Sequence, residues 1–253
     1  MKRAYNYKFQ PKDERDYIYK KTNIDIPMKY NITNNITENI NSSIIKSPIL
    51  DQGQLGACVA HAAASLFYIL SNRKINLSRL QLYFCCRGID GSKFDEDTGT
   101  YVRTALKSVA LYGLTNECFW KYNTNNFSKL PPRKSFRPVY TIKNYTYTSV
   151  PQNLESLKDC LSTGNPIIFG TLLYSSSNNT NATGIIPMPD IKNETLLGGH
   201  CMLLIGFDDY LKQFKIQNSW GPNWGDSGYG YLDYNYILNK DLTSDLWTVH
   251  FAI

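Results

Sequence analysis

A cysteine at the start of an apolar segment is the residue best placed for nucleophilic chemistry in this sequence. Cys58 follows a glycine-containing stretch and opens the apolar run 57–71, for which we expect a helix. The positive end of a helix favours the thiolate, which is the nucleophilic form of cysteine. Gln52, upstream, offers a second donor to an oxyanion beside the backbone N–H groups. Taken alone, this stretch fits a buried structural cysteine better than a nucleophile.

Among the three histidines, His200 has the surroundings expected of a general base. It follows two glycines and opens an apolar run, and after a turn near Asp209 the chain returns to Asn218. A hairpin centred on Asp209 would place residue 200 opposite residue 218. The Asn218 amide would then orient the imidazole and fix its tautomer. Two satisfied polar residues at strand ends explain the same pattern equally well.

The remaining histidines and Trp220 receive supporting or structural interpretations. His61 lies three residues after Cys58 on the expected helix, so no substrate fits between them and we expect local packing. His250 lies near the end of a C-terminal strand without an obvious companion. Trp220 is expected to cover the bond between His200 and Asn218 and keep water from it. Core packing by an aromatic side chain is the alternative.

Helix signals dominate the first half of the chain and strand signals the second. The expected helices cover 57–71, 78–86 with Ser78 as its cap, 100–113 with Thr100 as its cap, and 151–162. The expected strands cover 166–173, 201–207, 214–218, 228–232 and 246–253. This order predicts an α+β protein with a helical lobe and an antiparallel β lobe, and ligands commonly bind between such lobes.

Composition excludes several classes of protein. Of 253 residues, 42% are hydrophobic and 19% are charged, which is typical of a globular protein rather than a disordered one. No run of eighteen apolar residues predicts a membrane span, and residues 1–21 lack the apolar core of a secretory signal. The six cysteines have no spacing typical of structural zinc. We therefore expect reduced thiols, no metal and an intracellular protein.

Charge is concentrated at the N-terminus. Residues 1–29 hold eight basic and four acidic side chains of a chain whose net charge is +6. A nucleic-acid binder usually places its basic charge on a folded face, so a solvated leader is the simpler explanation, and we assign residues 1–23 to it. Residues 31–47, rich in Asn, Ile, Thr and Ser, are expected to be a low-complexity insertion.

Three separated motifs together resemble the papain-like cysteine peptidases. They are Gln52-Gly-x-x-Gly-Ala-Cys58, Gly199-His200 and Asn218-Ser-Trp-Gly. Their order is that of the family, and the histidine and asparagine follow Cys58 by 142 and 160 residues. The resemblance implies a papain-like peptidase domain over residues 24–253, with a helical lobe at about 48–125, a β lobe at about 126–253, and the active-site cleft between them.

The resemblance also implies a role for each matching residue. Cys58 is the expected nucleophile, His200 the base and Asn218 the orienting amide. Gln52 and the Cys58 backbone N–H are the expected oxyanion hole, and Trp220 supports the site. Gly99 and Gly199 are the expected substrate-binding positions.

Departures from the family pattern are informative. Leu55 stands where secreted members carry a disulfide cysteine, which agrees with a reducing compartment, and Val59 replaces an aromatic residue. The leader is too short for the family's helical prodomain and resembles that of bacterial and large-virus members, so carriage in a virus particle is a second possible location. We hypothesise that this leader occupies the cleft and restrains activity.

The predicted function is hydrolysis of peptide bonds by a cysteine endopeptidase through a thioester acyl-enzyme. It needs no cofactor, acts on a protein or peptide substrate as a monomer, and involves neither nucleic acid nor a membrane. One alternative is a papain-like binding module without catalysis. Another is a thiol isopeptidase, deubiquitinase or transamidase using the same site. Substrate side-chain preference stays open, because dispersed residues build the pocket that sets it.

Overall fold

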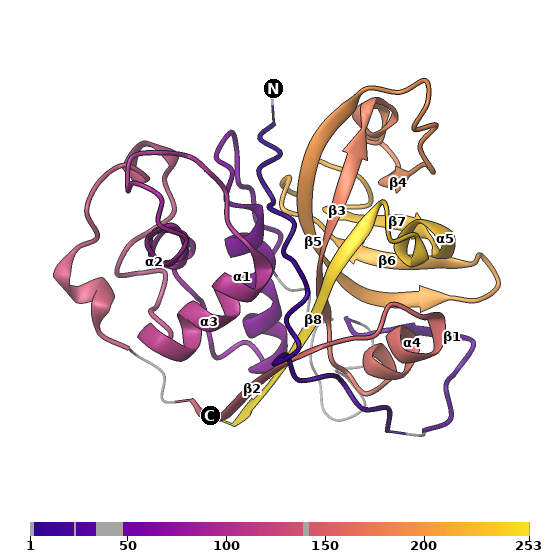
Figure 1. Ribbon diagram of the computed structural model, residues 1–253, viewed down its shortest axis with the longest axis horizontal. Coiled ribbons are helices and arrows are strands. Elements are labelled where there is room, and N and C mark those ends of the chain that lie inside the picture. Colours follow the sequence, from indigo (N-terminus) through magenta and orange to yellow (C-terminus); the bar gives the residue numbers. More distant parts are fainter. Residues whose placement is uncertain (1–2, 23, 34–47, 139–141, 253) are drawn as a thin grey trace.

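In the part of the chain that the structure describes, three α-helices lie together in one half of the molecule, and most of the strands, with the two remaining α-helices, form the other, in agreement with the α+β prediction (Figure 1). The computed structural model describes residues 3–22, 24–33, 48–138 and 142–252. One half contains α1 (Cys58–Leu70), α2 (Arg79–Ile89) and α3 (Val102–Tyr112). The expected insertion is described only at its start, where Asn31 ends strand β1; positions 34–47 lie outside the described residues.

The other half is an eight-stranded sheet whose order is β2-β8-β3-β5-β6-β7-β4, with β1 paired to β5. Its strands are β1 (Lys29–Asn31), β2 (Lys143–Ser149), β3 (Ile167–Tyr174), β4 (Ile185–Ile186), β5 (Leu196–Asp208), β6 (Gln213–Gln217), β7 (Tyr229–Asp233) and β8 (Thr243–Ala252). The pairs are antiparallel except β4 with β7. Helices α4 (Leu154–Ser162) and α5 (Tyr234–Leu238) and the 3-10 turns η1 (Thr124–Asn126), η2 (Arg133–Phe136) and η3 (Ser175–Asn179) complete the fold.

The helix caps agree with the sequence at two of the expected positions. The Ser78 hydroxyl accepts the N–H of Gln81 and starts α2, and Gly113, at φ +72°, ends α3. The prediction for Thr100 is wrong, because its hydroxyl donates to Asp90 and Tyr101 occupies the cap position without a capping bond.

Helix α4 also begins later than expected, at Leu154 rather than 151. The reason is Asn153, whose side chain accepts the N–H of Ser156 and so provides the cap. A proline at position 151 therefore lies outside the helix, in the chain that leads to it.

The hairpin of β5 and β6 has a different register from the predicted one. Asp208 pairs with Gln213, and near the other end Leu203 pairs with Gln217 after a shift in the ladder. The hairpin is therefore centred between residues 210 and 211 rather than at Asp209. The Asp208 carboxylate stabilises this turn by accepting the N–H groups of residues 210 and 211. Strand β6 ends before Asn218, which reaches His200 with its side chain from beyond the ladder.

Helix α1 packs against β5 and joins the two halves. Its sequence is apolar on almost every side, and each residue from Cys58 to Phe67 is buried. A helix that is apolar all round belongs in a protein interior, and its alanines allow the sheet to approach closely. The N-terminus of α1 is thereby fixed directly against the middle of the sheet.

The leader runs between the two halves rather than into solvent (Figure 1, indigo). Tyr7 and Tyr19 are buried. The Tyr19 hydroxyl donates to Asp159 at 2.8 Å, and Asp16 forms an ion pair with Arg103. These contacts make the leader part of the folded molecule.

Arg87 holds the loop that precedes the cleft. Its buried guanidinium donates to the carbonyls of Phe94, Glu96 and Phe127 at 2.7 to 2.9 Å. The loop carries Asp97, whose carboxylate accepts the N–H of Gly56 at 2.9 Å. Arg87 thereby positions the chain that delivers Cys58 to α1.

Arg87→Leu is expected to destabilise the protein by about 2–5 kcal/mol, because three backbone carbonyls lose a buried, charged donor. Urea unfolding at neutral pH measures the change. Arg15→Leu is the control, since that side chain is 89% exposed and should change stability by less than about 0.5 kcal/mol. Equal effects of the two substitutions would contradict this role for Arg87.

Candidate active site

Cys58 is the first residue of α1 and is fully buried. The preceding loop is fixed at both ends: the Gln52 N–H donates to the Ser219 carbonyl at 3.0 Å, and the Gly56 N–H donates to Asp97. The Cys58 thiol receives a hydrogen bond from the backbone N–H of Cys201, the residue directly after His200. The structure therefore brings the sulfur of the helical half next to the strand that carries the imidazole.

His200 lies on β5 and bonds to Asn218. The His200 Nε2 and Asn218 Oδ1 atoms are 2.8 Å apart, and the same oxygen accepts the Ser219 N–H at 2.8 Å. In a neutral imidazole Nε2 then donates and Nδ1 keeps its lone pair. Nδ1 is buried and has no hydrogen-bond partner within the described chain, so it is free to take a proton.

Trp220 lies over the imidazole of His200. Its ring stacks on His200 with centroids 4.8 Å apart and planes at 25°, and only 6% of the residue is exposed. Trp224 packs edge-on behind it, and Arg3 of the leader lies over it at 3.9 Å. Excluding water in this way strengthens the bond between His200 and Asn218.

The Gln52 amide is held in one orientation. Its Oε1 accepts the Ser219 hydroxyl at 2.7 Å, which turns Nε2 toward the Leu55 carbonyl at 3.0 Å and the Ala4 carbonyl of the leader at 3.4 Å. No sequence signal pointed to Ser219 as the support of Gln52, although Ser219 belongs to the motif around Trp220. An amide fixed in this way can donate to an oxyanion without reorganising.

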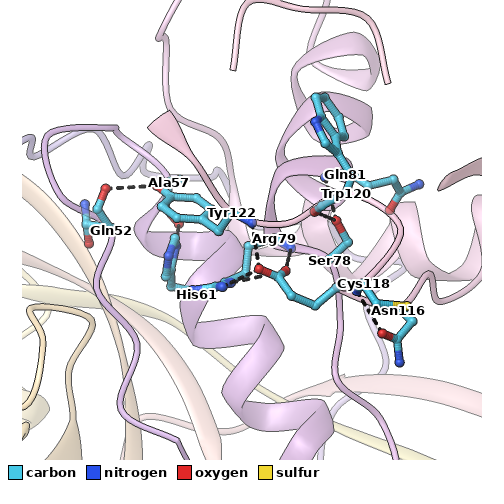
Figure 2. Close-up of polar contacts among 11 residues, drawn as sticks. Gln52, Ala57, His61, Ser78, Arg79, Gln81, Asn116, Cys118, Trp120 and Tyr122 are labelled. Carbon is cyan, nitrogen blue, oxygen red and sulfur yellow. Dashed lines mark hydrogen bonds and ion pairs between the residues drawn. The ribbon is translucent and has the colours of Figure 1, made fainter. Parts of the chain in front are cut away.

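His61 is placed away from this chemistry, as expected. Its Nδ1 lies 2.8 Å from the Ala57 carbonyl, and its ring meets the edge of Tyr122 at 4.5 Å. Figure 2 shows His61 beside Tyr122, whose hydroxyl donates to the Gln52 carbonyl at 2.9 Å. The other histidine, His250, stacks on Tyr19 of the leader.

The leader passes through the cleft between the two halves. The Tyr7 N–H donates to the Gly199 carbonyl at 3.0 Å, and the Lys8 N–H donates to Thr100 at 3.3 Å. A Cβ on Gly99 would lie 1.6 Å from the Asn6 carbonyl oxygen, and one on Gly199 would lie 2.5 Å from that of Tyr7. The two glycines predicted to bind substrate therefore contact the leader backbone.

Part of the cleft stays open beside the leader. A groove of about 800 Å³ is lined by Arg3, Tyr5, Gln54, Asn181 and Trp220. Tyr5 stands at its inner end with its ring edge-on to His200 and Trp220, at centroid distances of 6.3 and 6.1 Å. The leader was expected in the cleft, but the sequence did not identify Tyr5 as its contact, because these residues are far apart along the chain.

Burial dominates the protonation of the site. Burial raises the pKa of Cys58 to about 12. Hydrogen bonds from the N–H groups of Cys201 and Val59 act in the opposite direction and lower it, but burial is the larger effect. It also lowers the pKa of His200 to about 4, although the bond to Asn218 raises it. Burial therefore opposes the thiolate that the position of Cys58 at the start of α1 favours.

Neither a metal cluster nor a membrane span is found in the described residues. No group of three or more His, Cys, Asp or Glu side chains is arranged to hold a metal ion there. No helix in the same ranges has the length and apolar character needed to cross a membrane. All six cysteines are free.

Comparison with known proteins gives one family. A family model described as papain family cysteine protease matches residues 32–245. A peptidase C1-like protein of Acanthamoeba polyphaga mimivirus is 33% identical over 215 residues, covering 79% of this chain and 68% of that protein. The viral cathepsin of Adoxophyes honmai nucleopolyhedrovirus is 31% identical over 212 residues, covering 80% of this chain but 58% of the cathepsin. The crystal structure of xylellain, a cysteine protease from Xylella fastidiosa, has a TM-score of 0.86 at 30% identity and covers 98% of this chain and 96% of its own.

Stability is expected to fall as the pH is lowered from about 6.5 toward 4. Burial lowers the pKa of His61 to about 3 and of His200 to about 4, so below the ordinary value of about 6.5 the unfolded chain binds more protons than the folded one. Each histidine should then cost on the order of 2–4 kcal/mol. Urea unfolding between pH 7 and 4.5 measures this loss.

The variant His61→Phe isolates one histidine. It removes a titrating group from the core, so its stability should depend less steeply on pH than that of the unsubstituted chain. Identical pH slopes in the two proteins would show that His61 does not contribute.

Proposed function

Because the chain belongs to the papain family of cysteine proteases, we propose that it is an endopeptidase that cleaves peptide bonds through a thioester on Cys58. The observation that carries the proposal is the pairing of His200 Nε2 with Asn218 at 2.8 Å, which leaves Nδ1 as a free base on the strand beside the Cys58 thiol. Nucleophile, base and orienting group then come from both halves of the molecule.

The proposed reaction has two halves. The His200 imidazole takes the thiol proton, and the Cys58 sulfur attacks the carbonyl carbon of the substrate. Gln52 Nε2 and the backbone N–H of Cys58 donate to the oxyanion. The C–N bond breaks as the imidazolium gives its proton to the leaving amine. Water, deprotonated by the same imidazole, then hydrolyses the thioester and restores the thiol.

Asn218 and Trp220 support the imidazole in this proposal. The Asn218 oxygen holds the Nε2 proton, so the ring keeps the tautomer that exposes Nδ1 to the sulfur. Trp220 stacks on the ring and shields the bond from water.

The leader is proposed to restrain this reaction. Its Ala4 carbonyl lies 3.4 Å from Gln52 Nε2, the donor assigned to the oxyanion, and its Asn6 and Tyr7 backbones cover Gly99 and Gly199. Cys58 is fully buried in this arrangement, and the burial raises the pKa of its thiol. Opening would hydrate the site and remove the burial that disfavours the thiolate.

Two alternatives keep the same fold. A binding module without catalysis has no need for an oriented Gln52 amide and a free Nδ1, so the supported site favours an enzyme. An isopeptidase, deubiquitinase or transamidase would form the same thioester but use a different substrate or acceptor. Labelling of Cys58 by a thiol-directed epoxide separates enzyme from binding module. Mass spectrometry of products formed with an added amine separates hydrolysis from transamidation.

Cys58→Ala is expected to abolish cleavage of a fluorogenic peptide, and Gln52→Ala is expected to lower kcat/KM by roughly a hundredfold or more, because one oxyanion donor is lost. Lys74→Ala is the control, since Lys74 is exposed and lies after α1, away from the cleft, and it should leave kcat/KM within about twofold. Full peptidase activity in Cys58→Ala would falsify the mechanism.

Release of the leader is expected to raise activity. The double substitution Tyr5→Ala and Asn6→Ala removes the ring beside His200 and the side chain that packs on Gly56, and should increase kcat/KM by about tenfold, equivalent to about 1.4 kcal/mol of leader binding. Lys12→Ala, an exposed leader position, should have no effect. Unchanged activity in a folded double variant would mean that the leader does not restrain the site.

A further inference from the structure

Gln52, whose amide is the donor proposed for the oxyanion, is held through its backbone as well as through its side chain. Its N–H donates to the Ser219 carbonyl at 3.0 Å, and the Ser219 hydroxyl donates to Oε1 at 2.7 Å. Its carbonyl accepts the Leu55 N–H at 3.3 Å and the Tyr122 hydroxyl at 2.9 Å. Tyr122 lies in the chain after α3 and Ser219 in the chain after β6. The two halves of the molecule therefore hold Gln52 between them.

The ring of Tyr122 is supported by two other side chains. Figure 2 shows the ring between Gln52 and Arg79, with His61 beside it. The Arg79 guanidinium lies 4.7 Å from the ring centroid, and the His61 ring meets it at 90° with centroids 4.5 Å apart. A cation over an aromatic face is attracted to the ring, and a perpendicular arrangement is one that aromatic pairs prefer. These contacts direct the Tyr122 hydroxyl toward Gln52.

The backbone of Tyr122 is anchored by the Glu117 carboxylate. The Tyr122 N–H donates to Glu117 Oε1 at 2.7 Å. The same carboxylate forms an ion pair with the Arg79 side chain and accepts the Arg79 N–H at 3.2 Å, at the start of α2. Both side chains of the pair are largely buried, with exposed fractions of 15% and 13%. One carboxylate thus fixes the Tyr122 backbone, and the cation that it pairs with supports the ring.

The bond from Tyr122 leaves the Gln52 amide available for substrate. Burial raises the pKa of Tyr122, so the phenol keeps the proton that it donates at neutral pH. It donates to the backbone carbonyl and not to the side chain. Of the two protons on Gln52 Nε2, one faces the Leu55 carbonyl and the other faces the Ala4 carbonyl of the leader. The second proton becomes free when the leader leaves.

We propose that Tyr122 is a positioning residue for the oxyanion hole, because its hydroxyl fixes the Gln52 backbone and so directs the free Nε2 proton of that residue at the developing oxyanion. The inference rests on the proposed function, in which Gln52 Nε2 donates to that oxyanion. A donor fixed before the reaction stabilises the transition state without the cost of reorganising as charge develops. His61, which lies away from the proton transfer, acts in this arrangement as a support of the Tyr122 ring.

A double-mutant cycle on cleavage of a fluorogenic peptide by the full chain tests this role. Tyr122→Phe keeps the ring and removes the hydroxyl, so kcat/KM should fall about tenfold, mainly through kcat. In the Gln52→Ala background the same substitution should change kcat/KM by less than about twofold, because alanine keeps the backbone carbonyl but has no amide to position.

Tyr210→Phe is the matched control for the cycle. Tyr210 is 75% exposed in the turn after β5, so its substitution should have no effect in either background. Equal losses from Tyr122→Phe in the two backgrounds would show a general structural role and overturn the proposal, as would full activity of Tyr122→Phe.

Two probes of the Cys58 thiol give a test that does not need peptide cleavage. In alkylation by iodoacetamide, sulfur bonds to carbon, iodide leaves and the thiol proton goes to solvent. No oxyanion forms, so the rate should stay within about twofold in Tyr122→Phe. With a peptide aldehyde, sulfur bonds to the carbonyl carbon and the thiol proton passes to the former carbonyl oxygen, which takes the place of the oxyanion. Its Ki should therefore rise about tenfold.

The outcomes keep this role distinct from the proposed function. Weaker aldehyde binding in Tyr122→Phe without cleavage of any peptide would support the role of Tyr122 and reject peptidase activity. A tenfold loss with both probes would mean that the thiol itself is displaced, and would overturn the role. An aldehyde bound equally well by both proteins, or by neither, would also overturn it, whatever the chain cleaves.

Discussion

The close packing of the first turn of α1 on the middle of β5 is the constraint on which the rest of the structure depends. It puts the Cys58 thiol against the N–H of Cys201, one residue from the imidazole of His200. Small side chains in α1 permit this approach, whereas the twin glycines before His200 leave room for the leader. The loops then add Gln52, Asn218 and Trp220 around a contact that the helix and the sheet have already made.

The polar groups of the site are supported in pairs rather than singly. Ser219 is the clearest case, because its hydroxyl orients the Gln52 amide while its N–H bonds to Asn218. One residue thus links the donor assigned to the oxyanion with the amide that orients the imidazole. Asp97 likewise links two parts of the chain. Its carboxylate accepts the Gly56 N–H from the loop before Cys58 and the Tyr83 hydroxyl from α2. Such networks are rigid because each buried polar group depends on another.

The leader binds in the cleft of its own chain in the way that a peptide ligand would. It bonds to both walls of the cleft, sends Tyr7 into a pocket with a carboxylate floor and provides Arg3 to the outer face of Trp220. Its backbone also covers Gly99 and Gly199, the two positions at which the sequence predicted substrate binding.

Local periodicity, caps and motif order lie in neighbouring residues, so they were enough to predict α1 to α4, most of the strands, and Cys58, His200, Asn218, Gln52 and Trp220 as candidates. They did not predict α5 or the half-exposed strand β2, which alternates tyrosine with threonine, and a long turn with a ladder shift gave β5 and β6 a different register. The place of the leader in the cleft was a hypothesis from its charge and position; the packing of the two halves established it and brought Tyr7 to Asp245, 238 positions away. Contacts at such separation depend on the packing of whole elements, which no local pattern encodes.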